Sequence, residues 1–111
     1  MTNKATIPID YNTEEQALIE RVYSKINSTN KKAFLAIIRA NEQENGWARV
    51  TIDAFSTATY VSHESIIRAL GTMQKNGIIT IRKYRLKGAN ALRNEYKINT
   101  PDDIIALYKN Q

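Results

Sequence analysis

The side chains best suited to chemistry lie in two stretches of the sequence, a polar run at 60–68 and a basic run at 82–97. Hydroxyl, imidazole, carboxylate and guanidinium groups crowd into the polar run, which contains Tyr60, Ser62, His63, Glu64, Ser65 and Arg68. Such groups at the start of a helix can bind phosphate oxygens and read the edges of bases. The polar run therefore indicates contact with a nucleic acid.

Each polar side chain has a definite partner if the contact is with duplex DNA. Arg68 can donate two hydrogen bonds to guanine, and Glu64 can accept one from the amino group of cytosine. Ser62 and Ser65 can hold a phosphate together with the helix N-terminus. The alternatives are structural. Glu64 and Arg68, four residues apart, can pair on the helix surface, His63 is expected to face solvent, and Ser62 can serve as a cap alone.

The basic run concentrates the positive charge of a chain whose net charge is +5. Its cations are Arg82, Lys83, Arg85, Lys87, Arg93 and Lys97, and Glu95 is its one acid. A cluster of this kind is typical of a surface that meets phosphates. The cations predicted to contact DNA are Lys83, Arg85, Lys87 and Arg93. The alternative is a solvated hairpin whose charged edge discourages aggregation.

The composition of the chain argues against several classes of protein function. The chain has 111 residues, of which 42% are hydrophobic, enough for one compact domain with its own core. It has no cysteine and one histidine, so we expect neither a disulfide nor a metal site, and no cofactor. Scattered carboxylates and the lack of a phosphate-cradling glycine loop argue against an enzyme. No apolar run approaches the roughly 20 residues of a membrane span, so we expect a cytoplasmic protein without a membrane partner.

The first half of the chain is interpreted as a polar arm followed by two helices and a short strand. Residues 1–12 form the arm, and Thr13 is expected to cap the first helix. Apolar residues then recur at helical spacing over 14–27 and over 31–43. Residues 47–50 are expected to form a short strand that pairs with a later hairpin.

Two more helices are predicted between 51 and 76. Thr51 and Ser62 are placed to cap them. In the second of these helices Ile66, Leu70 and Met73 fall at i, i+4 and i+7, which predicts a buried face. The polar run then lies on the opposite, exposed face.

Strand-like runs at 78–86 and 95–99 follow, on either side of a loop that contains glycine and asparagine. Alternation predicts that Tyr96 and Ile98 point inward, opposite the inward isoleucines of the first run. The pattern indicates an antiparallel hairpin that carries the basic run.

The last segment, 100–111, is predicted to be an apolar helix. Thr100 is the expected cap and Pro101 the first helical residue. Its apolar side chains are Ile104, Ile105, Leu107 and Tyr108. A short apolar helix needs a partner surface, so it either folds back on the first helix or mediates self-association into a homodimer or higher oligomer.

Residues 50–99 resemble the winged helix-turn-helix superfamily, an α+β fold that is mainly α with a small antiparallel sheet. The matching motifs are Phe55-Ser56, Tyr60-Val61-Ser62, Ser65-Ile66, Arg68, Leu70, Met73, Gly77-Ile78-Ile79 and Asn94-Glu95-Tyr96-Lys97-Ile98. The chain looks most like small proteins of plasmids, phages and staphylococcal cassette elements that act in replication, maintenance or regulation. The resemblance implies a winged-helix domain over 13–99 and a DNA partner, but it is weak for biological role.

Tyr60 departs from the family pattern, because the turn before the recognition helix normally holds glycine. A left-handed backbone at tyrosine costs roughly 1 kcal/mol or more. We expect its ring to pack on the edge of the core. The alternative is an exposed ring that stacks on an unpaired base.

Three function classes remain open. The first, which the residues favour, is a duplex-DNA binder of a mobile genetic element, acting in replication, maintenance or transcription control. The second is a single-stranded DNA binder that uses the basic run with Tyr60, Tyr84 and Tyr96 and assembles through its C-terminal tail. The third is a protein-interaction module.

Overall fold

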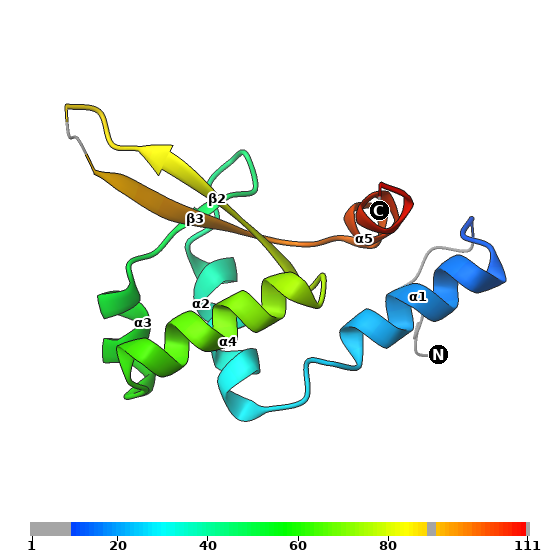
Figure 1. Ribbon diagram of the computed structural model, residues 1–111, viewed down its shortest axis with the longest axis horizontal. Helices are drawn as coiled ribbons and strands as arrows, with labels where there is room; N and C mark the ends of the chain where they lie inside the picture. Colours follow the sequence, from blue (N-terminus) through cyan, green and yellow to red (C-terminus); the bar gives the residue numbers. More distant parts are fainter. Residues whose placement is uncertain (1–9, 89–90, 111) are drawn as a thin grey trace.

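The computed structural model describes residues 10–88 and 91–110. Within this part the chain forms five helices and a three-stranded antiparallel sheet (Figure 1). The elements in order are α1 (Thr13–Tyr23), α2 (Thr29–Ala40), β1 (Ala48–Arg49), α3 (Ile52–Thr59), α4 (His63–Lys75), β2 (Ile79–Arg85), β3 (Leu92–Ile98) and α5 (Pro101–Lys109). This is the predicted α+β winged-helix arrangement with a C-terminal helix.

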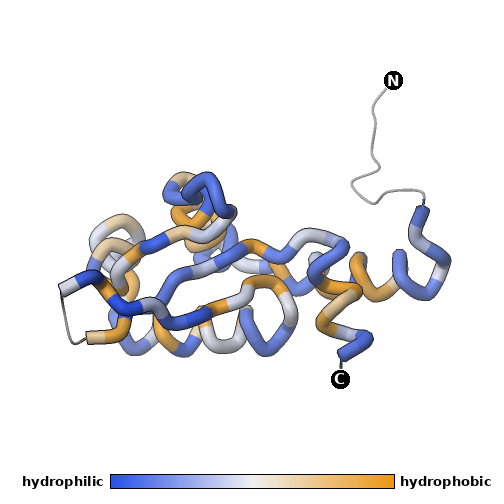
Figure 2. Tube along the Cα trace, turned by 90° about the horizontal axis from the view of Figure 1, so that it is seen from above, coloured by the Kyte–Doolittle hydropathy of each residue, from blue (hydrophilic) through white to orange (hydrophobic). Residues whose placement is uncertain are grey.

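The molecule is elongated, because a hairpin projects at one end and a helix pair at the other. Helices α2, α3 and α4 group beside the sheet, and β2 and β3 extend past them (Figure 1). The hairpin of β2 and β3, with the residues that join them, is called the wing below. Figure 2 shows α1 and α5 together at the end opposite the wing. The principal extents are 45 × 29 × 28 Å.

The register of the wing agrees with the predicted alternation. Ile79 lies opposite Ile98, and Ile81 lies opposite Tyr96. These four side chains point toward the helices, because alternate residues of a strand share a face. The strand order is β1-β3-β2, so β1 pairs with the outer side of β3 as expected.

On the other face of the sheet, Glu95 lies between two arginines in one cross-strand row. Arg49 and Arg82 are its neighbours in β1 and β2. The Arg49 Nε donates to Glu95 Oε1 over 3.2 Å, and the Arg82 Nε donates to Oε2. Each guanidinium also covers an aromatic ring at 3.8 Å, Arg49 over Tyr84 and Arg82 over Trp47. Every strand of the sheet thus contributes to one ionic cluster.

The Glu95 side chain is buried although it is ionised. Burial raises the pKa of its carboxyl, but the hydrogen bonds and charges of Arg82 and Arg49 outweigh that effect and hold the pKa below its usual value. A buried charge is tolerated when it is paired and hydrogen-bonded in this way.

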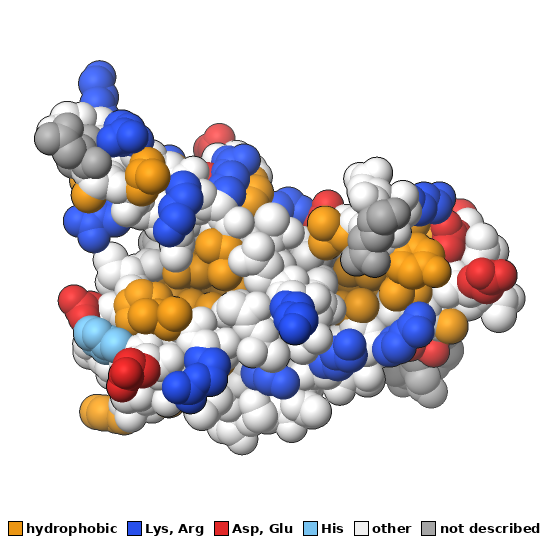
Figure 3. All heavy atoms as spheres, viewed as in Figure 1, with side chains coloured by type: hydrophobic (Ala, Val, Ile, Leu, Met, Phe, Trp, Pro, Cys, Tyr) orange, Lys and Arg blue, Asp and Glu red, His pale blue; other side chains and the backbone are white. Residues whose placement is uncertain are grey.

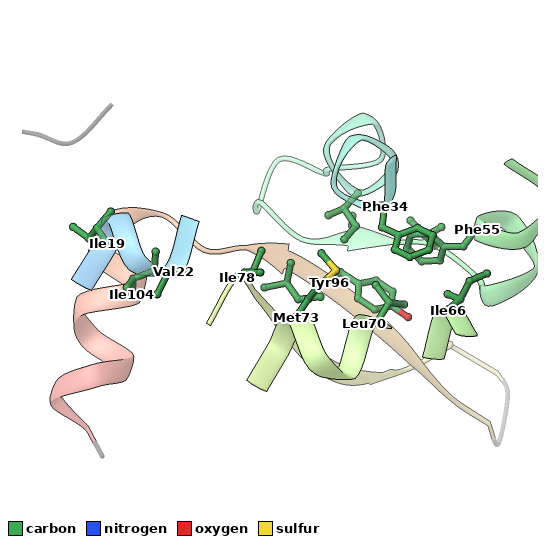
Figure 4. Close-up of a cluster of buried hydrophobic side chains, with 14 of the residues drawn as sticks. Ile19, Val22, Phe34, Phe55, Ile66, Leu70, Met73, Ile78, Tyr96 and Ile104 are labelled. Atoms are coloured by element: carbon green, nitrogen blue, oxygen red, sulfur yellow. The ribbon is translucent and has the colours of Figure 1, made fainter. Parts of the chain in front are cut away.

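The helical core centres on three aromatic rings that meet edge to face (Figure 4). Phe55 of α3 lies 5.7 Å from Phe34 of α2 and 5.6 Å from Tyr96 of β3, between ring centroids. The predicted buried face of α4, which is Ile66, Leu70 and Met73, packs into this core. Packing on this side leaves the polar side of α4 in solvent.

Helix α5 packs against α1 of the same chain. Ile104 and Ile105 are buried, in a cluster with Ile19 and Val22 of α1 (Figure 4). The expected cap Thr100 is in place and forms a capping box. The first helix is therefore the partner surface for the buried half of α5.

Polar contacts also tie α5 to the chain. Lys97 at the end of β3 pairs with Asp103, and Lys109 reaches Glu15 at 3.5 Å. The Tyr11 hydroxyl donates to Asp102, and the carboxylate it faces raises the pKa of Tyr11 to about 12. Charge pairing therefore flanks the apolar contact.

Several predicted boundaries were wrong. The cap of α1 is Asn12, whose side chain bonds Glu15 N at 2.8 Å, rather than Thr13. The helix ends at Tyr23 instead of 27, because Lys25 and Ile26 N–H groups bond carbonyls three residues back. The predicted arm falls mostly on residues 1–9, which lie outside the described residues.

Two further elements differ from their predicted ranges. Helix α2 spans Thr29–Ala40 rather than 31–43, because the amide of Gln43 bonds the carbonyl of Trp47 at 2.9 Å and reverses the chain. Gly46 supplies the left-handed φ of 84° in that turn. The return strand begins at Leu92 rather than 95, because the three residues before Glu95 already pair with the end of β2.

Replacing the central acid of the sheet, Glu95→Gln, is expected to lower the free energy of unfolding at pH 7 by about 1–2 kcal/mol. Removing one partner of a fully buried pair costs about 3–5 kcal/mol. The loss is smaller here because the Arg49 and Arg82 side chains are 46% and 52% exposed, and water screens them.

The pH dependence of that stability has a definite sign. Because the pKa of Glu95 is lowered by folding, its contribution is present above the unfolded value of about 4.3 and is lost as the pH falls through the folded pKa. Urea unfolding at pH 7 and at acid pH measures this, with the exposed Glu44→Gln as control. If Glu95→Gln loses as much stability in acid as the wild type, Glu95 does not contribute in this way.

Candidate nucleic-acid interface

The first turn of α4 presents the polar run to solvent. The Ser62 side chain caps the helix by accepting from Ser65 N at 3.3 Å, and its hydroxyl donates to Ser65 Oγ at 3.0 Å. Glu64 and Arg68 are exposed one turn apart, and no ion pair joins them in the described part of the chain. The alternative of a surface pair was therefore wrong, and both groups are open to a ligand.

His63 faces solvent as expected, but it also contacts the neighbouring helix. Its Nε2 lies 3.0 Å from Asp53 Oδ1 of α3. Both side chains are more than half exposed, so the pair contributes little to stability. This contact links the two helices across the turn.

Tyr60 forms that turn with a left-handed backbone, φ 59° and ψ 23°. The residue is 94% exposed, so the prediction that its ring packs on the core edge was wrong. Val61 is the turn residue that packs inward, and its carbonyl accepts from the Ser56 hydroxyl at 2.8 Å. Because Val61 occupies the inward position, the ring of Tyr60 is left in solvent beside the start of α4.

The wing cations differ in whether a carboxylate holds them and in their exposure. Arg82 and Lys97 are held by Glu95 and Asp103, which removes them from the basic surface that the sequence suggested. The exposed side chains of Lys83, Lys87 and Arg93 have no ion pair within residues 10–88 and 91–110, and Arg85 is exposed as well. The basic surface is therefore the outer half of the wing.

The aromatic side chains differ in their access to solvent. Tyr96 is buried in register with Ile81, so the prediction that it stacks on bases was wrong. Tyr84 is partly buried and one face of its ring is covered by Arg49. Among these three tyrosines, Tyr60 alone offers a fully open ring.

Figure 3 looks onto the face where α4 and the wing meet and shows basic side chains around a hollowed apolar area. This hollow has a volume of about 390 Å³ and is lined by both elements. Sequence reasoning missed it, although an isoleucine inside the polar run, Ile67, was a usable signal. Arg49 was missed too, because its partner Glu95 is 46 residues away.

The described part of the chain has neither a metal site nor a membrane-spanning helix. Across residues 10–88 and 91–110, acidic, histidine and cysteine side chains nowhere gather in threes as a metal site would need. The helices of the same residues are all too short or too polar to cross a bilayer.

The order and pairing of these helices and strands give a winged-helix-like fold. A comparison with solved structures found a protein from Methanosarcina mazei Go1 described as a possible transcriptional regulator, with a TM-score of 0.50 and 13% identity. The match covers 96% of this chain and 91% of that chain. No protein-family model and no curated protein matches the sequence. At this identity the likeness shows a shared fold.

The strain at the turn leads to a stability prediction. Tyr60→Gly is expected to raise the free energy of unfolding by up to about 1 kcal/mol, because glycine adopts the left-handed backbone freely. Tyr60→Ala retains the Cβ and its strain, and it should leave stability close to that of the wild type. Thermal unfolding of the three proteins measures the difference. A loss of stability in Tyr60→Gly would mean that the ring has a structural contact.

Proposed function

We propose that this protein binds DNA through the face formed by α4 and the outer half of the wing. The observation that carries the proposal is that polar groups at the start of α4 and the cations of the outer wing are exposed on one face of the molecule. The exposed polar groups at the start of α4 are the cap Ser62 with His63, Glu64 and Arg68, and Ser65 beside them is partly buried. A helix that reads a groove while a basic hairpin contacts the backbone is the usual winged-helix mode.

Duplex DNA is the form that this arrangement fits first. Arg68 and Glu64 extend from one side of α4 and would contact base edges. Ser62 and Ser65 would bind a phosphate at the helix N-terminus, and the wing would add phosphate contacts from Lys83, Arg85, Lys87 and Arg93. By sequence resemblance alone, the biological role would be replication, maintenance or transcription control of a mobile genetic element.

The wing contribution can be tested by removing two unpaired cations. Lys87→Ala/Arg93→Ala should weaken binding to every DNA sequence and reduce the salt slope by about one unit for each phosphate that the variant no longer binds. Fluorescence anisotropy over a salt series gives both quantities. The control, Lys32→Ala/Arg39→Ala, removes the same charge from exposed positions of α2. If the two double variants bind alike, the wing does not contact phosphates.

Single-stranded DNA is the second candidate, and the exposed ring of Tyr60 favours it. A tyrosine that is 94% exposed on a strained backbone has a ring that is suited to stack on a base. The anisotropy experiment therefore includes a labelled single strand and its matching duplex at the same salt. Tighter binding of the single strand would indicate that Tyr60 stacks on a base and that the wing cations contact the phosphates of the strand.

We also propose self-association through the exposed side of α5. Ile104 and Ile105 already pack on α1, which leaves Leu107 and Tyr108 exposed at 43% and 60%. In Figure 3 hydrophobic side chains gather at this end of the molecule. Winged-helix proteins that bind palindromic sites do so as symmetric dimers, and this face would supply the interface.

Exchanging these two side chains for serine tests the interface. Leu107→Ser/Tyr108→Ser should convert a dimer into a monomer without a large change in melting temperature, because neither side chain is in the core. Sedimentation equilibrium measures the mass. The control is Leu86→Ser/Leu92→Ser, which removes two equally exposed leucines at the wing. A wild type that is monomeric at every concentration would rule out the interface.

A further inference from the structure

The hollow between α4 and the wing has the form of a ligand site. Its apolar surface comes from α3, α4 and β2, and the residues that matter here are Ile52, Ile67, Gly71, Ile81, Lys83 and Asn94. Ile67 is 59% exposed there, in the middle of an otherwise polar helix face. A charged phosphate backbone gains little from contact with an apolar surface, whereas the face of a flat ring packs well on one.

Gly71 keeps the hollow open. Glycine inside a helix costs about 1 kcal/mol relative to alanine. Close packing does not require it here, because a Cβ added at Gly71 would meet nothing within 4 Å. The missing side chain therefore leaves space on the wing side of α4 at a cost in helix stability.

Asn94 adds a side-chain oxygen that lacks a partner, although the same side chain also forms a hydrogen bond with the Tyr96 hydroxyl. It lies opposite Lys83 in the hairpin. Its side-chain oxygen is buried and, among the residues the structure describes, has no hydrogen-bond partner. An unpaired buried acceptor costs about 1–3 kcal/mol, so a ligand that brings an N–H group would be stabilised. Because this oxygen is buried, a neighbouring side chain must move before a ligand can reach it, and the exposed Lys83 is its cross-strand neighbour.

The donor requirement selects among the parts of DNA. The sugar-phosphate backbone of DNA has acceptors and no N–H or O–H donor along the chain. Bases carry amino and imino donors. In a duplex the amino groups still donate into the grooves, but stacking covers the faces of the rings, so an unpaired base is the part of DNA that brings a donor and an open ring face together. An unpaired base thus meets all three features of the hollow, namely an apolar floor, an orphan acceptor and a nearby cation for its phosphate.

We infer that the hollow binds one unpaired nucleobase of a DNA strand, with the ring on Ile67 and Ile81, a base N–H on Asn94 and a neighbouring phosphate on Lys83. This inference rests on the proposed DNA binding and specifies its single-strand mode. Tyr60, at the other end of α4, would then contact a different nucleotide.

The test compares the wild type with Gly71→Leu, which fills the hollow, and Gly71→Ala, which hardly does. Both substitutions replace a helical glycine, so both variants should melt at or above the wild-type temperature. The probes are a labelled mixed-sequence single strand, the same strand with abasic residues, and the matching duplex. Gly71→Leu should bind the intact strand about tenfold more weakly, since a stacked base contributes about 1–3 kcal/mol, while Gly71→Ala stays within about twofold.

The outcomes separate this inference from the proposed function. Loss of intact-strand affinity by Gly71→Leu, with unchanged binding of abasic strand and duplex, supports a seated base. Equal affinity of Gly71→Leu and wild type for the intact strand overturns the inference and leaves DNA binding intact. Equal weakening on all three probes also overturns it, because the hollow would then contact the backbone. A wild type that binds none of the probes overturns the proposed function itself.

Discussion

The sheet depends on one buried carboxylate. Arg49 and Arg82 both bond Glu95 and both lower its pKa, and the three residues meet only when β1, β3 and β2 align in a single register. A slip by one residue would turn the acid toward the helical core and the ring of Tyr96 toward solvent. The same alignment places Lys83 and Asn94 on the side that faces α4. The geometry of the candidate interface therefore follows from an ion cluster on the opposite face of the sheet.

The cluster also decides which charges are available to a ligand. In sequence the basic run looks uniform, but Arg82 and Lys97 are committed to Glu95 and Asp103. Positive charge remains in the outer half of the wing, where Lys83, Lys87 and Arg93 are exposed to water. Such cations can exchange water for phosphate with little desolvation cost, whereas drawing Arg82 away would leave a buried carboxylate unpaired. The inner wing is thus structural and the outer wing is free to bind.

Local patterns made much of this fold predictable. The caps Ser62 and Thr100 and the inward alternation of Tyr96 need information from a few neighbouring residues, and the structure confirms them. The pairing of Arg49 with Glu95 spans 46 residues and depends on the strand order. The outward ring of Tyr60 depends on its neighbour occupying the inward position. In the candidate site, residue types were predictable, while their access to solvent required the tertiary structure.

Two residues break local rules, and both border the same exposed face. Tyr60 adopts a left-handed backbone that suits glycine, and Gly71 occupies a helix interior that suits alanine. The backbone therefore favours glycine at position 60 and a residue with a side chain at position 71. Neither departure is explained by core packing, because the tyrosine ring is in solvent and the glycine faces open space. Residues that oppose the local backbone preference and gain no packing are expected where a surface is shaped for a ligand. Tyr60 adds an exposed ring, and Gly71 leaves a hollow open. A single strand of DNA that stacks one base on the ring and inserts another into the hollow would require both features.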